Sequence, residues 1–181
     1  MEPIISPIEP HTLAWEIEHL PGEALLVDAG KEQVFLVDGK QAPHVLGEIG
    51  RLREVTFRLA GEGTGKSIDL DEYDPHYFHL FIWNKADREI IGSYRMGMTD
   101  VILKKYGVKG LYTSDLFGYQ RQLLDQIGPA MELGRAFVRP EYQRSYTPLM
   151  LLWKGIGQCI ARQPQYRHLL GPVSINTNTT A

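Results

Sequence analysis

Hydrophobic residues recur along this chain with two different periods. In residues 43–59 and 147–160 they fall three and four positions apart, the spacing of a helix that buries one face. Short apolar runs bounded by turn residues predict strands instead. These runs are residues 24–27, 33–37, 77–83, 89–98 and 131–138. The pattern therefore alternates between strand and helix, as expected for a domain with a sheet and packed helices.

Weaker signals predict the remaining elements. We expect a loose proline-rich arm over residues 1–10, a short helix over 12–19, an extended segment over 111–116, a helix over 117–127 and a strand over 169–175. The clearest hairpin signal is Asn84-Lys-Ala-Asp87, which separates two strand patterns.

Residues 131–160 predict a strand, a short loop and a helix in succession. Pro140 ends the strand, because proline cannot continue a central strand. Thr147 is expected to cap the helix, with Pro148 at its first position. A strand that feeds a helix N-terminus favours anion binding, and Arg139 and Arg144 flank this loop.

Composition favours one soluble domain. The chain has 181 residues, 43% of them hydrophobic, and a formal charge of −3, which argues against a broad nucleic-acid surface. We expect residues 1–42 to form an arm and hairpin packed on a core of residues 43–181. A single cysteine, Cys159, falls on the apolar side of its helix and fits a reducing compartment. No signal peptide or spanning run is seen, so the expected location is cytoplasmic, with peripheral contact at the inner membrane face left open.

One glycine-rich stretch is similar to a phosphate-binding loop. Ala60-Gly-Glu-Gly-Thr-Gly65-Lys66-Ser67 has alanine where the first glycine should be. A predicted helix precedes the stretch, whereas a phosphate-binding loop must follow a strand and open a helix. We therefore predict a plain glycine loop.

Neither the acidic cluster nor the histidines predict a metal. Asp69, Asp71 and Asp74 lack the glycine and glutamate that a calcium loop requires. The cluster is either a solvated turn or a site for a substrate ammonium. His76 and His79 fall on opposite faces of an extended segment, so His79 is kept only as a candidate base.

The sequence also resembles a known family. Glu132-Leu-Gly-Arg135, followed by Phe137-Val138-Arg139-Pro140, resembles the central strand and cofactor loop of GNAT-fold acyltransferases. It looks most like the branch of acyl-homoserine-lactone synthases and ornithine- and glycine-lipid N-acyltransferases, a branch that also carries the name hemolysin. The resemblance covers residues 49–175. Its other carriers are Arg51, Arg53, Phe57-Arg58, Asp69-x-Asp71-x-x-Asp74 and Ser93-Tyr94-Arg95.

The resemblance implies an α+β sandwich. A mixed, mostly antiparallel sheet would carry helices on both faces. The predicted elements match such a core up to its fifth strand. Either the last elements of the fold are missing, or the chain belongs to a longer protein, as in relatives with a second, lipid acyltransferase domain.

The implied activity is transfer of a fatty acyl group from a phosphopantetheine thioester to the amine of an amino acid or similar small amine. No cofactor would be bound permanently. Tyr146 and Pro148 occupy positions where the family usually has glycines that close around a pyrophosphate. That departure favours acyl carrier protein over coenzyme A as the donor, because the carrier brings a single phosphodiester.

The resemblance also implies roles for individual residues. Glu132 would accept the amine proton, and N–H groups between Gly134 and Phe137 would hold the oxyanion. Arg135 and Arg95 would orient the acceptor carboxylate or the donor, and Asp71 and Asp74 would hold the ammonium. The donor would contact Val138, Arg139, Arg144, Tyr146 and Thr147.

These roles have requirements and alternatives. Residues three apart on a strand point to opposite faces, so Glu132 and Arg135 can share a site only if the strand bulges near Gly134. A structural ion pair inside the sheet is the other reading. The open alternatives for function are a lactone-forming synthase, a coenzyme A-dependent acetyltransferase and a non-catalytic module that docks carrier protein.

Overall fold

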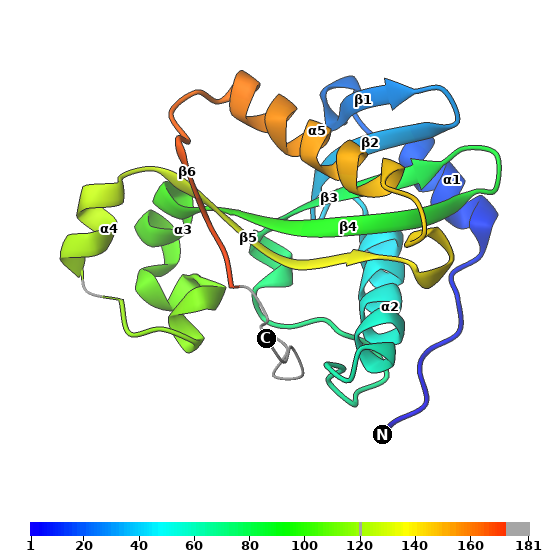
Figure 1. The fold of residues 1–181 in the computed structure, drawn as a ribbon, viewed down its shortest axis with the longest axis horizontal. Helices are drawn as coiled ribbons and strands as arrows, with labels where there is room; N and C mark the ends of the chain where they lie inside the picture. Colours follow the sequence, from blue (N-terminus) through cyan, green and yellow to red (C-terminus); the bar gives the residue numbers. More distant parts are fainter. Residues whose placement is uncertain (120, 173–181) are drawn as a thin grey trace, which may run out of the picture.

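One six-stranded sheet organises the protein (Figure 1). The computed structural model describes residues 1–119 and 121–172, without the side chains of residues 121 and 122. The strands follow one another across the sheet in chain order: β1 (Leu25–Ala29), β2 (Glu32–Asp38), β3 (Phe78–Asn84), β4 (Glu89–Met98), β5 (Ala130–Val138) and β6 (His168–Leu170). All neighbours pair antiparallel except β5 and β6, which run parallel.

Helices cover both faces of this sheet (Figure 1). The helices are α1 (Pro10–Glu18), α2 (Pro43–Leu59), α3 (Thr99–Tyr106), α4 (Arg121–Ile127) and α5 (Thr147–Arg162). One core joins α5 to side chains such as Leu80 and Met96, and the other joins α1 and α2 to Phe81 and Phe137. The predicted mixed, mostly antiparallel sheet with helices on both faces is thereby confirmed.

Local chemistry explains the two best-predicted connections. The Asn84 side chain accepts from the N–H groups of Ala86 and Asp87, which closes the β3–β4 turn. Helix α2 ends at Leu59 and is followed by Gly61 (φ 79°), with N–H bonds from Gly61 to the Arg58 carbonyl and from Glu62 to the Phe57 carbonyl. These two bonds define a Schellman motif, which favours glycine at the left-handed position.

The segment between β4 and β5 differs from expectation. Residues 111–116 are not extended: Tyr112–Asp115 forms a 3-10 turn after a similar turn at Val108–Gly110. Helix α3 was not predicted, and α4 starts later than expected. The turn at Tyr112–Asp115 is held by distant side chains, since Tyr77 accepts the Tyr112 N–H and Glu132 accepts the Thr113 N–H.

Two further expectations at helix and strand ends need correction or restriction. Thr147 does not cap α5: it is the first helical residue, and the capping position belongs to Tyr146, which makes no side-chain capping bond. Of the predicted strand over 169–175, residues 169 and 170 belong to β6, residues 171 and 172 are not in a strand, and residues 173–175 lie outside the described part of the chain.

Cys159 is buried as expected, and burial raises the pKa of its thiol to about 11. None of the helices described is long and apolar enough to cross a bilayer.

Candidate active site

Strand β5 bulges at Arg135. Arg95 on β4 pairs with Gly134, whereas Ser93 pairs with Phe137, so two residues of β5 face the single residue Tyr94. Arg135 takes a left-handed conformation (φ 47°), which is uncommon and costly for any residue but glycine. The strand therefore has the irregularity that the Glu132–Arg135 spacing required.

The bulge opens into a cavity of about 800 Å³. The cavity lies where β5 and β6 part, because their pairing ends at Glu132 and Leu170. Its walls come from both sides of the sheet. They comprise Phe57 and Glu62 at the end of α2, Trp153 on α5, Tyr94 on β4, Tyr112, Leu116 and Phe117 in the turn segment, and residues 133–136 and 169–172. Two substrates can therefore meet at the bulge from opposite faces.

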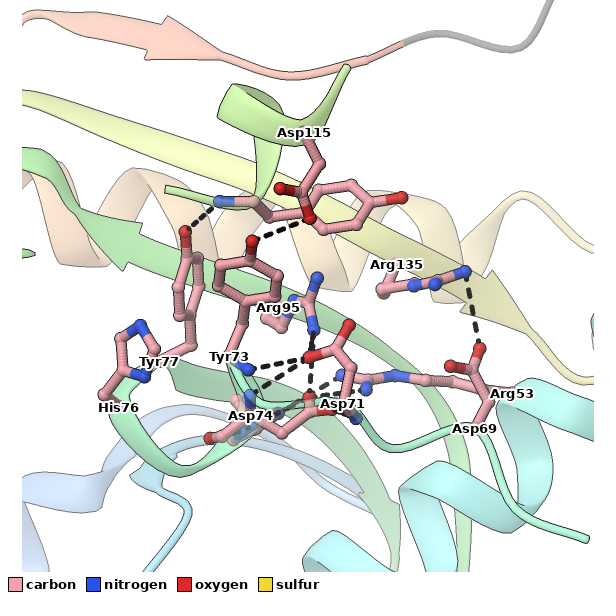
Figure 2. A network of polar contacts seen from close by, with 12 residues as sticks. Arg53, Asp69, Asp71, Tyr73, Asp74, His76, Tyr77, Arg95, Asp115 and Arg135 are labelled. Carbon is pink, nitrogen blue, oxygen red and sulfur yellow. Dashed lines mark hydrogen bonds and ion pairs between the residues drawn. The ribbon is translucent and has the colours of Figure 1, made fainter. Parts of the chain in front are cut away.

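A largely buried ion-pair network joins Arg53 and Arg95 to Asp71 and Asp74, and Arg135, which lines the cavity, forms a separate pair with Asp69 (Figure 2). Arg53 donates from Nη1 to Asp74 Oδ1 at 2.7 Å. Arg95 donates from Nη1 to Asp71 Oδ1 at 2.6 Å and lies 3.4 Å from Asp74 Oδ1. Burial raises the pKa of Asp74, but Arg53 and Arg95 outweigh it and hold that pKa well below its usual range. Asp71 and Asp74, the predicted ammonium ligands, are thus engaged by arginines of the same chain.

Aromatic rings enclose the Arg95 guanidinium. Its carbon lies 4.7 Å from the Tyr112 ring centre, 5.2 Å from that of Tyr77 and 5.7 Å from that of Tyr73. Within the described residues, Arg95 Nη2 is buried without a hydrogen-bond acceptor. Arg95 does not line the cavity, so its visible role is to bind the acidic turn to β4.

His79 is a buried member of the same network. Its Nε2 lies 3.0 Å from the Asp74 carbonyl oxygen, and its Nδ1 lies 3.3 Å from Arg53 Nη2. Because a carbonyl can only accept, Nε2 carries the proton and Nδ1 accepts from the arginine. Burial, with the charge of Arg53, lowers the pKa of His79 to about 4, so the ring is neutral. This position gives His79 a structural role.

Arg135 reaches the cavity wall directly. Its Nη1 lies 3.5 Å from Asp69 Oδ2, and its guanidinium lies 5.4 Å from the Tyr112 ring centre and 5.9 Å from that of Phe57. Burial raises the pKa of Asp69, and Arg135 opposes that rise. Within the described residues, Arg135 Nε is buried without a hydrogen-bond acceptor. The side chain therefore offers a donor that no described protein group uses.

Glu132 lies under the wall of the cavity rather than in it. Its carboxylate is 2% exposed and accepts hydrogen bonds from the Tyr77 hydroxyl, the Thr113 hydroxyl and the Thr113 N–H, the last at 2.7 Å. The Tyr119 hydroxyl in turn donates to Thr113 Oγ1 at 2.6 Å. Glu132 is not among the described cavity-lining residues. Its carboxylate fastens the Tyr112–Asp115 turn, which carries part of that wall, to the sheet.

The glycine-rich loop holds a carboxylate of its own chain. Glu54, on α2, accepts from the Thr64 N–H at 3.0 Å, the Gly65 N–H at 2.9 Å and Arg58 Nε at 2.6 Å. Burial raises the pKa of Glu54, but hydrogen bonds from Thr64, Arg58 and Gly65 outweigh it and lower that pKa to about 2. The N–H groups that would meet a phosphate in a true phosphate-binding loop face this internal anion instead.

The predicted donor loop has an ordered start and an exposed end. Arg139 donates from Nη1 to Glu89 and from Nη2 to Glu141, the latter at 3.1 Å, and the Gln143 side chain donates to the Val138 carbonyl at 2.8 Å. Arg144 and Tyr146 are exposed, and Thr147 begins α5. Phe137, predicted near the reaction centre, packs in the core with α2, whereas Gly134 lines the cavity.

Sequence reasoning missed Glu62. This residue lines the cavity and is the one carboxylate among its described lining residues. The sequence predicts only a glycine loop at this position. The available signal was Ala60-Gly61-Glu62 directly after an amphipathic helix, since glycine there marks a helix end and fixes the next residue. Elsewhere in residues 1–119 and 121–172, no three His, Cys, Asp or Glu side chains are grouped so as to hold a metal.

Comparisons with known proteins agree with this architecture. The profile described as "Acetyltransferase (GNAT) domain" matches residues 52–154. A protein of Bacteroides thetaiotaomicron named glycine N(alpha)-acyltransferase is 36% identical over 97% of this chain and 55% of its own length. A protein of the same name from Phocaeicola vulgatus is 33% identical over 97% of this chain and 57% of its own. An L-ornithine N(alpha)-acyltransferase of Brucella abortus is 29% identical over 74% of this chain and 50% of its own. The chain thus spans about half the length of these relatives.

Proposed function

The chain belongs to the GNAT acetyltransferase family, and from this premise we propose that it is an N-acyltransferase that acylates the amine of an amino acid. The donor would be a fatty acyl thioester of phosphopantetheine, and the products would be an N-acyl amino acid and a thiol. The names of the relatives from Bacteroides and Phocaeicola favour glycine, or another small α-amino acid, as the acceptor.

The observation that carries this proposal is the bulge of β5 inside a cavity reached from both faces of the sheet. A bulge leaves its extra residue outside the regular ladder. The backbone N–H groups at Gly134 to Ala136 are therefore the candidates to polarise the thioester carbonyl and stabilise the oxyanion. Leu133 and Leu170 on the parting strands give this point apolar walls, which suit an acyl chain.

The two ends of the cavity differ in chemistry. Trp153 on α5 marks the donor end, where α5 also exposes Leu149 and Met150 and the preceding residue Tyr146 is exposed. Arg135 lies at the acceptor end, beside Phe57. Its partly exposed guanidinium suits the carboxylate of an amino acid, because the two groups would form charge-assisted hydrogen bonds.

Acyl carrier protein fits the donor end better than coenzyme A. Tyr146, just before α5, and Pro148, in its first turn, stand where the family usually has glycines, which leaves a cradle suited to one phosphodiester rather than a pyrophosphate. The exposed Arg144 would face the acidic carrier surface. On this proposal the activity belongs to amino-acid lipid synthesis, and a fused or separate lipid acyltransferase would use the product at the inner membrane face.

The test is a transfer assay with defined substrates. Purified protein is incubated with palmitoyl-acyl carrier protein, palmitoyl-coenzyme A or palmitoyl-pantetheine, each with glycine, ornithine or no amine. Free thiol and product mass are followed. N-palmitoylglycine formed fastest from the carrier protein is the expected result. Thiol release that ignores the amine would indicate a hydrolase, and carrier binding without thiol release would indicate a docking module.

A further inference from the structure

We propose that Glu62, not Glu132, is the carboxylate that binds the acceptor ammonium and removes its proton. This inference rests on the proposed function. It follows from the charges that face the cavity: within the described lining, Glu62 is the one anion and Arg135 the one cation. The other lining side chains are apolar or are the tyrosines Tyr94 and Tyr112. A cavity with one charge of each sign complements a zwitterion, and an α-amino acid carries both charges.

The backbone presents Glu62 to the cavity in a fixed position. Its N–H donates to the Phe57 carbonyl at 2.8 Å, as the last bond of the Schellman motif that ends α2. Phe57 also lines the cavity, and its ring centre lies 5.9 Å from the Arg135 guanidinium carbon. The cation and the anion are therefore arranged around the same aromatic residue.

Contacts of residues 63–66, on the C-terminal side of Glu62, also hold the loop in place. Glu54 accepts hydrogen bonds from Thr64 and Gly65, and Arg58 Nη2 donates to the Lys66 carbonyl at 2.6 Å. A Cβ on Gly63 would lie 2.5 Å from the Arg58 side chain, so this close approach requires glycine. The buried Glu54 carboxylate thus acts as the anchor of the loop that displays Glu62.

Glu132 cannot take the same role without moving the cavity wall. Both of its oxygens accept from protein donors, Thr113 on one and Tyr77 on the other. A base must come within hydrogen-bond reach of the proton it removes, directly or through one water. Glu62 lines the cavity, whereas Glu132 does not and is bonded to the Tyr112–Asp115 turn that forms part of the cavity wall.

The reaction would then balance as follows. The acceptor carboxylate binds Arg135, and its ammonium gives one proton to Glu62. The neutral amine attacks the thioester carbon, the C–N bond forms and the C–S bond breaks. The leaving thiolate takes the second proton from nitrogen, which yields amide and thiol. The proton held by Glu62 passes to water.

The experiment compares Glu62→Gln with Glu62→Asp and with the control Glu18→Gln, an exposed carboxylate on α1. At neutral pH, Glu62→Gln should lower kcat for glycine by ~10²-fold or more, with KM for the acyl donor unchanged. Its rate should rise with pH toward that of the wild type, because hydroxide then prepares the free amine. Glu62→Asp should recover part of the activity, and Glu18→Gln should match the wild type.

Hydroxylamine, whose nitrogen is largely unprotonated at neutral pH, separates chemistry from folding. After the rate without enzyme is subtracted, Glu62→Gln should acylate hydroxylamine nearly as fast as the wild type does. Equal losses with glycine and hydroxylamine would assign Glu62 a structural role, and full glycine activity in Glu62→Gln would also overturn the inference. If the wild type itself forms no acyl-glycine, the proposed function fails, and that outcome is distinct from either result.

Discussion

The Thr113 N–H donates to Glu132 Oε1 at 2.7 Å, and this bond joins the wall of the cavity to strand β5. The sequence predicted a reactive Glu132, because its place on the strand matched the family motif. The structure shows a carboxylate that is already saturated by hydrogen bonds from Thr113 and Tyr77. Its first effect on catalysis should therefore be through the position of the Tyr112–Asp115 turn.

The Glu132→Gln variant tests this positioning role. The amide keeps one oxygen for Thr113 but turns an NH₂ toward Tyr77, so we expect a loss of about 1–2 kcal/mol in unfolding free energy. KM for the acceptor should rise, while the shape of the pH–rate profile should stay that of the wild type. Denaturant titration and initial rates from pH 6 to 9 provide the measurements. If Glu132→Gln removes one limb of the pH–rate profile and Glu62→Gln does not, Glu132 would be the base.

Acid should loosen the glycine loop through Glu54. Its folded pKa of about 2 lies below the ordinary 4.5, so the carboxylate contributes stability above about pH 4.5 that is lost as the pH falls toward 2. Linkage gives a contribution on the order of 3 kcal/mol. Glu54→Gln should flatten the fall in unfolding free energy between pH 5 and 2. Glu141→Gln is the control: its pKa is also lowered, but the side chain is exposed and screened. Identical slopes in both variants would contradict the assignment.

Gly61 and Gly30 have nearly the same positive φ, so their alanine variants distinguish the effect of backbone strain from an effect on catalysis. Gly61 has φ 79° and Gly30 has φ 82°, and neither would place a Cβ within 4 Å of another group. Alanine at either position should cost about 1 kcal/mol of stability, because left-handed backbone is unfavourable for it. Only Gly61→Ala should also reduce kcat with glycine, since it displaces Glu62. Thermal melts and steady-state kinetics of the two variants provide the measurements. Equal activity in both variants would contradict a role for the end of α2 in the site.

Two arginines with left-handed backbone allow a similar comparison. Arg88 (φ 52°) lies in the β3–β4 turn, and Arg135 (φ 47°) lies in the bulge. Arg88→Gly should stabilise the protein by up to about 1 kcal/mol through relief of strain. Arg135→Gly should relieve the same backbone strain, but its unfolding free energy should fall overall, because the change leaves Asp69 buried without its paired cation. Acceptor KM should rise only in Arg135→Gly.

The double variant Arg135→Gly/Asp69→Asn extends this comparison. Removal of the unpaired carboxylate should restore stability, measured by urea titration, but should leave the acceptor KM high. Recovery of both quantities together would show that Arg135 acts on the substrate only through the fold.

Tryptophan substitutions test the donor end. Trp153 is 48% exposed and lines the cavity, whereas Trp15 on α1 is 61% exposed and lies elsewhere. Either change to alanine should have little effect on stability, because both rings are half in solvent. Trp153→Ala should raise KM for palmitoyl-acyl carrier protein several-fold, and Trp15→Ala should not. If donor length or donor KM is insensitive to Trp153, the acyl chain takes another path.

The sequence predicted the parts of this fold whose causes are local. The β3–β4 hairpin follows from Asn84 and its neighbours, and α2 and α5 follow from periodic apolar faces. The Tyr112–Asp115 turn could not be predicted, since its N–H groups find their partners on Tyr77 and Glu132, 35 and 19 residues away. Secondary-structure propensity carries no information about hydrogen-bond partners that lie so far apart in the sequence.

The same limit applies to the site. The motif pointed to the strand that carries Gly134 and Arg135, and that strand has the bulge that a shared site for Glu132 and Arg135 would require. The partners of Asp71 and Asp74 were not visible, because Arg95 and Arg53 reach them from other elements. Glu62 was hidden for the opposite reason: its cue was local, but the similarity to a phosphate-binding loop drew attention away from the helix end.

The arginine–aspartate network and the neighbouring Arg135–Asp69 pair have a consequence for recombination between relatives. Their members come from α2, from the loop before β3, from β4 and from β5, and the charges are matched only when all four segments come from compatible sequences. A chimera with a junction between Asp74 and Arg95 would separate partners that are buried together. Exchange of whole halves at such a point succeeds only among relatives that share these charges, so the network sets where the gene can be cut and rejoined.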